Sequence, residues 1–252
     1  MMNYYDDIST VFADKPVFTR SEFDNYVKTR KPTLNDSSSG WLLYNLCQRR
    51  VIQRIARNLY RLYTNDYLQK EYKPNLTIEA SKVLEYLIEQ FPLITFIVWE
   101  TKAFNEFANH QIHRNFVFVE AEKMCSESVF NKLREQCGYM TLYKPCEKEI
   151  SLYSSDVTVV VLPLISESPI NGHYTRLEKM LVDLFASKLL NQIISKSDFA
   201  GIYEEAFARY SVNYNMMMRY AKRRNKKDVI SSFIMERTNI ASVGKESFYD
   251  NP

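Results

Sequence analysis

Five arginines lie close together in the first quarter of the chain, and their guanidinium groups suit phosphate binding. They fall within the thirteen residues from 49 to 61, a run that contains no acidic residue. They are Arg49, Arg50, Arg54, Arg57 and Arg61. A guanidinium presents a planar fork of donors that matches phosphate oxygens bidentately. The run therefore predicts a nucleic-acid contact, and the alternative is a basic hairpin that only keeps the domain soluble.

The residues just before this run predict a helix over residues 36–49. Asn35 or Asp36 can cap its start, because a short side-chain oxygen accepts from the unpaired N–H groups of the first turn. Apolar residues at helical spacing mark a buried face, and they are Leu42, Leu43, Leu46 and Cys47. The opposite face carries Ser37, Trp41, Tyr44 and Gln48.

We expect this second face to enter the major groove of DNA. Hydroxyls at a helix N-terminus suit a phosphate or a base edge, and the candidates are Ser37, Ser38 and Ser39. Gln48 can read a base edge, while Trp41 and Tyr44 can pack on sugars or thymine methyls. The alternative for the two aromatic residues is burial in a core or between domains, where large rings usually lie.

The arginines themselves fall mostly on a predicted β-hairpin. Strand-forming residues flank its turn, and they are Val51, Ile52, Ile55, Leu59, Leu62 and Tyr63. The turn falls at residues 57–58, because Asn58 tolerates the positive φ that a tight turn needs. We expect this wing to contact the DNA backbone or the minor groove. The contacting residues would be Arg54, Arg57, Asn58 and Arg61.

A helix over residues 15–31 would support the recognition helix. Thr19 and Glu22 form a T-x-x-E capping box, in which each residue satisfies the other's backbone N–H, and Pro32 ends the helix. The order helix, linker, helix, hairpin predicts a winged helix-turn-helix. Contacts that position the domain on DNA without reading sequence would come from Lys28, Arg30, Lys31, Arg49 and Arg50.

Charge is distributed unevenly along the chain. Residues 1–14 carry three acids and no base, residues 15–73 carry twelve Lys/Arg against five acids, and residues 74–252 carry 21 against 22. The net charges of these segments are −3, +7 and −1, and that of the whole chain is +3. A basic module on a neutral body is typical of nucleic-acid binding by one domain only.

The fold class that we expect is α/β (α+β), with a winged helix followed by a mixed α/β domain that ends in a helical bundle. The polar stretch at 64–75 marks the domain boundary, and alternating strands and helices beyond it predict a mixed sheet covered by helices. The expected parts are an N-terminal arm (1–15), a DNA-binding domain (16–73), an α/β domain (76–238) and a flexible tail (239–252). The expected strands of the α/β domain are 93–99, 115–119, 141–143, 150–153 and 157–164. Its expected helices include 78–90, 101–110, 128–137, 198–209, 213–223 and 226–235.

Motifs of catalysis are scarce. None of the five glycines forms a P-loop, a G-x-G-x-x-G or a nucleophile elbow. His110 and His113 could share a helical face near Cys125, but a zinc site needs four ligands of credible spacing. The triplet ETK at 100–102, at the end of a predicted strand, suits a metal-dependent nuclease, and a solvated strand end is the alternative. We expect no enzyme, no metal and no cofactor.

Targeting signals are also missing. The start, MMNYYDDIST, lacks the basic and apolar regions of a signal peptide, and the longest apolar run, around 91–99, is too short to span a bilayer. The four cysteines form no C-x-x-C pair, which indicates reduced thiols. We expect a cytoplasmic protein that does not engage a membrane.

Three segments resemble the AbiEi-type regulators, the antitoxins of type IV toxin–antitoxin systems. GWLLYNLCQRRVIQRIARNLYRLY (40–63) is similar to that family's signature of a helix, basic residues, a short strand, a basic turn and Leu/Val-Tyr. TRLEKMLVDLFA (175–186) and MMMRYAKR (216–223) are similar to helices of its C-terminal domain. The chain departs from the pattern at Asn58, where the family usually has Gly.

The resemblance implies a transcriptional regulator that binds double-stranded DNA at its own promoter and autorepresses its operon. It also implies that the protein counteracts a nucleotidyltransferase-fold toxin, without requiring a stable complex between the two. Two other classes stay open: a metal-dependent nuclease with a winged-helix targeting domain, and a winged-helix protein-interaction module. The clustered arginines count against the interaction module, because the cores of protein-binding faces are depleted of charge.

Overall fold

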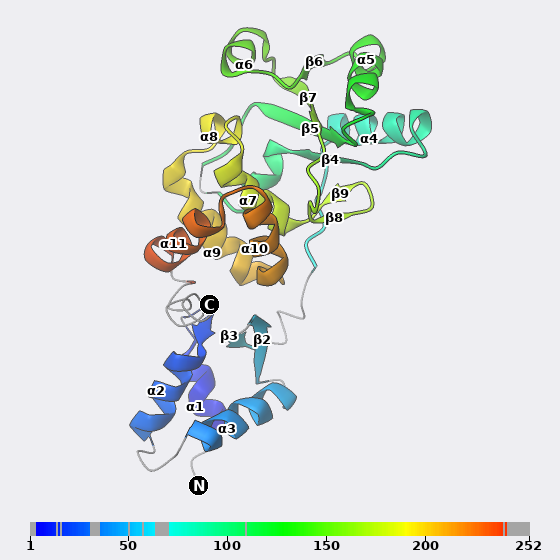
Figure 1. Cartoon of the computed structure of the whole chain (residues 1–252). Coiled ribbons are helices and arrows are strands. Elements are labelled where there is room, and N and C mark those ends of the chain that lie inside the picture. Colours follow the sequence, from blue (N-terminus) through cyan, green and yellow to red (C-terminus); the bar gives the residue numbers. More distant parts are fainter. Residues whose placement is uncertain are drawn as a thin grey trace. The chain divides into compact units, whose positions relative to one another are not determined.

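The computed structural model divides the chain into two compact units (Figure 1). It describes residues 4–13, 15, 17–30, 36–49, 51–56, 58–63, 71–108, 110–238 and 240. The first unit comprises residues 1–71, 203–215 and 227–252, and the second comprises residues 72–202 and 216–226. The first division of the chain falls close to the predicted boundary at 64–75. The region after this boundary differs from the single domain that we expected over 76–238, because residues 203–215 and 227–252 group with the N-terminal segment.

The N-terminal part of the first unit alternates helices with a small sheet. Its elements are α1 (Tyr4–Val11), β1 (Phe18–Thr19), α2 (Arg20–Arg30), α3 (Asp36–Gln48), β2 (Ile52–Ala56) and β3 (Leu59–Leu62). The strands form an antiparallel sheet in the order β1-β3-β2. The predicted capping box of α2 is confirmed, since Glu22 Oε2 accepts from Thr19 N at 2.8 Å and Glu22 N donates to Thr19 Oγ1 at 2.9 Å.

Helix α1 was not expected, because residues 1–15 were predicted to be an N-terminal arm. Ile8 in this helix is 0% exposed, and Phe12, the residue after the helix, is 3% exposed. The ring of Phe12 stacks on that of Phe18 with centroids 4.2 Å apart. The segment is therefore part of a core that also contains Phe23, Val27, Leu43, Leu46, Ile52 and Tyr60.

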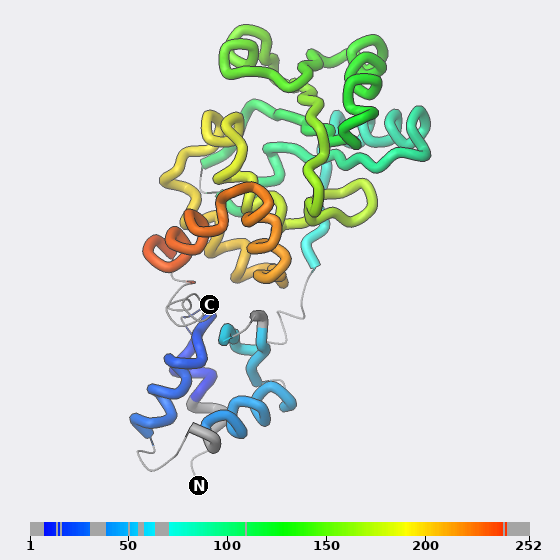
Figure 2. Tube along the Cα trace, viewed as in Figure 1, coloured from blue at the N-terminus to red at the C-terminus, as the bar shows by residue number. Residues whose placement is uncertain are grey.

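The second unit is built on a six-stranded sheet, whose path can be followed from cyan to yellow in Figure 2. The strands are β4 (Phe96–Glu100), β5 (Asn115–Ala121), β6 (Met140–Tyr143), β7 (Val157–Pro163), β8 (Ile170–Asn171) and β9 (Tyr174–Thr175). Their order is β6-β7-β5-β4-β9-β8. Strands β5, β6 and β7 are parallel, and β4 runs antiparallel to β5. The mixed sheet predicted from the alternating pattern is thus confirmed.

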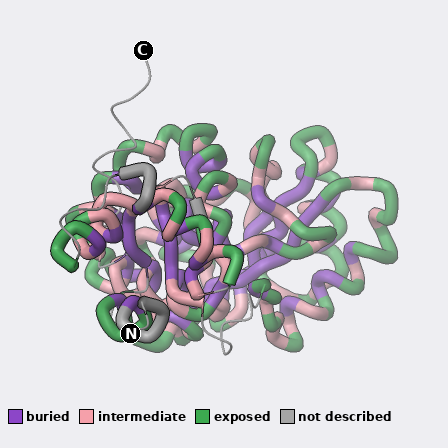
Figure 3. Tube along the Cα trace, turned by 90° about the horizontal axis from the view of Figure 1, so that it is seen from below, coloured by how far each residue is buried: buried purple, intermediate pink, exposed green. Residues whose placement is uncertain are grey.

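Helices cover both faces of this sheet. Those shown against it are α4 (Ile78–Gln90), α5 (Ser126–Gln136) and α7 (Leu177–Ala186). The other helices of this part of the chain are α6 (Glu147–Tyr153), α8 (Leu190–Ile193), α9 (Phe199–Arg209), α10 (Tyr214–Arg223) and α11 (Lys227–Arg237). Helices α9 and α10 have residues in both units, and α11 belongs to the first unit. α4 and α5 pack against one face of β4, β5 and β7 in a common core. α7 contacts the other face through Lys179. Strands buried on both faces read as continuous apolar runs, and Figure 3 shows such buried segments in purple.

Two elements of the second unit differ from expectation. Residues 150–153 read as a strand, but they belong to α6, because Glu149 caps that helix by accepting from Cys146 N at 2.7 Å. The helix expected over 101–110 is a shorter 3-10 helix, η2 (Thr101–Glu106). Within it, Asn105 Oδ1 accepts from Ile112 N at 2.7 Å and Asn105 Nδ2 donates to Ile112 O at 3.3 Å, which ties η2 to the loop that follows it. Among the described residues, no helix is long and apolar enough to cross a membrane.

Candidate nucleic-acid interface

Helix α3 places its two large aromatic side chains in solvent. Trp41 is 69% exposed and Tyr44 is 61% exposed, whereas Leu43 and Leu46 are 3% and 0% exposed. Gln48 is exposed on the same side, since residues 41, 44 and 48 share one helical face. The aromatic residues therefore lie outside the core of the first unit, contrary to the alternative of burial in a core. The structure thus shows that Trp41, Tyr44 and Gln48 form an exposed face of α3.

Ser39, near the start of α3, does not share this surface. Ser39 is 3% exposed, and its hydroxyl bonds the carboxylate of Asp24 in α2. Asp24 also accepts from Arg20 Nε at 2.8 and 2.9 Å. Ser39 therefore joins α3 to α2, which corrects the expectation that it contacts DNA. Ser37 and Ser38 lie in α3, but their side chains are outside the described residues.

The hairpin has the turn that its sequence predicts. Asn58 adopts a positive φ of 59°, and its carbonyl accepts from Arg20 N at 3.0 Å. A bulge interrupts the β2–β3 register between Arg54 and Ala56. Arg54 is exposed, and its charge opposes the rise that burial causes in the pKa of Tyr60. Arg57 lies outside the described residues.

Arg61 lies inside the first unit instead of on its surface. It is 7% exposed, its Nε donates to Gln53 Oε1 at 3.0 Å, and its Nη1 donates to the carbonyl of Tyr210 at 3.4 Å. Side chains alternate along a strand, so Arg61 points away from the core residues Tyr60 and Leu62. That second face of the sheet is also covered, and the prediction that Arg61 clamps DNA is corrected.

The remaining basic candidates lie near the C-terminal ends of the two helices. Lys28 and Arg30 are exposed in the last turn of α2, and Arg49 is exposed just after α3. Cations at these positions are stabilised by the helix dipole. Lys31 and Arg50 lie outside the described residues.

The ETK triplet in the second unit has a structural role. Glu100 is fully buried and accepts from the N–H and the hydroxyl of Thr77 at 2.5 and 2.7 Å, and from the amide of Asn115. Thr77 is the N-cap of α4, so Glu100 fixes the start of that helix. It is neither a solvated strand end nor part of a carboxylate cluster. In the described part of the chain, no group of three or more His, Cys, Asp and Glu side chains could hold a metal.

A buried ionic cluster at the other face of the sheet was missed by the sequence analysis. Lys179 is fully buried and donates to Glu120 at 2.5 Å and to Asp183 at 2.6 Å. Arg224 donates to Asp183 at 2.7 Å, and Trp99 donates to Glu120 at 2.8 Å. Burial lowers the pKa of Lys179, but the two carboxylates outweigh it, so that the pKa is raised. The feature of the sequence that could have predicted it is the pair Lys179 and Asp183, four residues apart in a mostly apolar helix.

Comparison with known proteins gives a family but no function. The model of a family with the description "Family of unknown function (DUF6577)" matches residues 38–240. No curated protein matches the chain significantly.

Proposed function

Because the chain belongs to the DUF6577 family, whose function is unknown, its function must be inferred from its own residues, and we propose that it is a DNA-binding transcriptional regulator. In this proposal the part of the first unit from α1 to β3 is a winged helix, with α3 as recognition helix and the β2–β3 hairpin as wing. The protein binds double-stranded DNA at its own promoter and represses its own operon.

The observation that carries the proposal is the exposed face of α3 within this order of elements. Helix α3 follows α2 and leads directly into the β2–β3 hairpin, and this order of helix, helix and hairpin supports the proposal, because helix-turn-helix proteins place the second helix in a major groove. Trp41 and Tyr44 project from that helix into solvent. Exposed large aromatic residues at adjacent turns indicate a binding surface.

Each group on this surface has a separate task in the proposal. Gln48 reads a base edge, and Trp41 and Tyr44 pack on sugars and thymine methyls. The backbone phosphates are bound by exposed cations, which are Lys28, Arg30, Arg49 and Arg54. Lys31, Arg50, Arg57 and the hydroxyls of Ser37 and Ser38 remain candidates from the sequence, whereas Ser39 and Arg61 are withdrawn because they are buried.

The antitoxin part of the proposal rests on the AbiEi resemblance of residues 40–63, 175–186 and 216–223. In this view the protein counteracts a nucleotidyltransferase-fold toxin and needs no stable complex with it. It has no catalytic activity of its own. The nuclease alternative is weakened, because Glu100 is enclosed by Thr77 and Asn115.

A second function is favoured by one observation, the aromatic character of the α3 face. Aromatic residues are enriched where proteins bind proteins, so the same face could serve a protein-interaction module. The cations near the ends of α2 and α3 distinguish the two functions, because phosphate contacts make binding depend steeply on salt.

An electrophoretic shift with DNA from directly upstream of the gene, with and without Mg²⁺, tests the proposal. We expect a discrete, salt-sensitive complex with intact DNA in both lanes, and about tenfold or more weaker binding by Trp41→Ala. Gln48→Ala should change the preference between operator variants, because a base contact carries discrimination. DNA cut only with Mg²⁺ would overturn the repressor and favour the nuclease. No shift at low salt would leave the protein-interaction module.

A further inference from the structure

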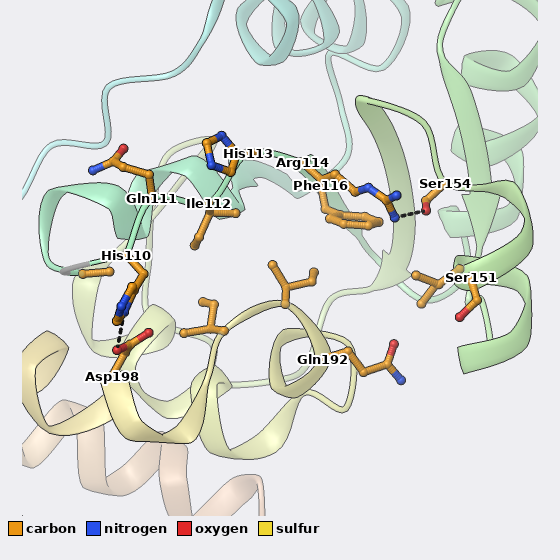
Figure 4. A pocket seen from close by; sticks show the side chains of 14 residues that line it. His110, Gln111, Ile112, His113, Arg114, Phe116, Ser151, Ser154, Gln192 and Asp198 are labelled. Carbon is orange, nitrogen blue, oxygen red and sulfur yellow. Dashed lines mark hydrogen bonds and ion pairs between the residues drawn. The ribbon is translucent and has the colours of Figure 1, made fainter.

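A pocket of about 460 Å³ opens in the second unit at the entry to strand β5 (Figure 4). One wall is the segment 110–114, which leads from η2 into β5. The other wall comes from the end of α6 and from residues 192–198. The volume lies in the range of pockets that enclose small organic ligands.

The loop wall is held in place by its own hydrogen bonds. Asn105 accepts from Ile112 N at 2.7 Å and donates to Ile112 O at 3.3 Å. Thr101, which is fully buried, donates to the carbonyl of Arg114 at 3.3 Å. Because these contacts fix the backbone on both sides of His113, the pocket is formed before any ligand arrives.

The floor of the pocket is apolar. Phe116, Ile150 and Ile194 line it and are 2%, 7% and 3% exposed. Ile112 and Ile193 add to the same lining. A ring face and branched side chains at this depth suit a flat apolar group, because its burial is favourable in proportion to the area removed from water.

The rim is polar and carries positive charge. Arg114 is exposed and extends toward Ser154, to whose hydroxyl its Nη1 donates at 3.4 Å, a contact that leaves the charge unneutralised (Figure 4). His110 Nδ1 lies 3.0 Å from Asp198 Oδ1, which orients the imidazole. Asp198 is the one acid among the described residues that line the pocket, and it is engaged with His110.

We propose that this pocket binds a 5′-nucleoside monophosphate. The phosphate is bound by Arg114, whose planar fork matches two phosphate oxygens, with the hydroxyl of Ser154 beside it. The base lies against Phe116 and the isoleucines. The amides of Gln111 and Gln192, which also line the pocket, are donors and acceptors suited to the edges of a base. This site is independent of the DNA-binding surface on α3.

Isothermal titration of the full chain tests the proposal. The probes are AMP, GMP, CMP and UMP, together with the four nucleosides and inorganic phosphate. We expect at least one monophosphate to bind with Kd below about 1 mM. The corresponding nucleoside and inorganic phosphate should each bind at least about tenfold more weakly than that monophosphate, since each retains only one half of the contacts.

Variants locate the binding. Arg114→Ala should weaken binding of the monophosphate at least about tenfold, because a charge-assisted hydrogen bond is lost. Ser151→Trp should block the pocket from its exposed rim and leave Arg114 in place. Lys148→Ala is the control. Lys148 is an exposed cation that lies in helix α6 with Ser151 but does not line the pocket.

Three results would overturn the proposal: no monophosphate binding below 1 mM, binding unaffected by Arg114→Ala and Ser151→Trp, or a nucleoside that binds as tightly as its monophosphate. DNA binding measured in the same preparation is a separate readout. If the chain binds DNA but none of the probes, only the nucleotide-site proposal fails. If it binds a monophosphate but no DNA, only the regulator proposal fails.

Discussion

Side chains of the same type have opposite roles in this protein, and only their surroundings separate them. Arg54 and Arg61 lie seven residues apart in one basic hairpin, yet Arg54 is exposed and Arg61 is buried against Gln53 and Tyr210. The first guanidinium therefore lies on the surface, whereas the second contributes to the stability of the unit.

This difference gives a paired prediction for the hairpin. Arg54→Ala should weaken DNA binding and reduce the slope of log K against log salt by about one unit, with little change in the free energy of unfolding. Arg61→Ala should leave the slope unchanged and lower the free energy of unfolding by about 1–3 kcal/mol, because buried acceptors lose their donor. Titrations at several salt concentrations and urea unfolding measure both. Equal salt slopes for Arg54→Ala and the natural chain would remove Arg54 from the interface.

Lys179 is the clearest case of a charge retained inside a core. Lys179→Met should lower the free energy of unfolding by about 3–5 kcal/mol, because Glu120 and Asp183 lose their shared partner while they stay buried. Lys188→Met, at an exposed lysine after the same helix, should change it by less than about 0.5 kcal/mol. Urea unfolding followed by circular dichroism compares the two. Similar small effects would mean that water reaches the cluster.

At the scale of elements, the helices and strands follow from local chemistry except where distant partners intervene. The capping box at Thr19 and the turn at Asn58 are local, and both are confirmed. The end of η2 depends on Asn105 reaching Ile112, and the identity of α6 depends on Glu149 capping Cys146. A strand-forming composition at 150–153 is outweighed by that cap.

Helix α1 provides an element-scale prediction. Phe12→Ala should lower the free energy of unfolding of the first unit by about 3–5 kcal/mol, since a buried ring leaves a cavity between Phe18 and Tyr26. Val11→Ala is the matched control, because its side chain is 44% exposed. Thermal unfolding of both variants decides whether residues 4–12 are core. If Phe12→Ala and Val11→Ala had equal effects, residues 4–12 would be an arm and not part of the core.

At the scale of the whole molecule, the first unit is discontinuous in sequence. It takes residues 203–215 and 227–252 in addition to the first 71. Arg61 bonds Tyr210 across that gap in sequence. The N-terminal residues and segments near the end of the chain therefore belong to one compact unit.

This organisation predicts the behaviour of a fragment. Residues 1–73 alone should show weaker amide protection from hydrogen exchange in β2 and β3 than the same strands in the full chain, because Arg61 lacks the Tyr210 carbonyl. Exchange followed by mass spectrometry on both samples tests this. Equal protection would show that the N-terminal residues form a unit complete in itself.

The sequence by itself determined the features that depend on neighbours along the chain. Helical spacing placed Leu43 and Leu46 inside and Trp41 and Tyr44 on the other face of α3, and the alternation of strands and helices predicted the mixed sheet. Only the tertiary structure decided what covers each face. Whether an arginine, a serine or a glutamate is exposed depends on segments far away in sequence, as Arg61, Ser39 and Glu100 show, and desolvation of a polar group is offset only by partners that folding brings to it.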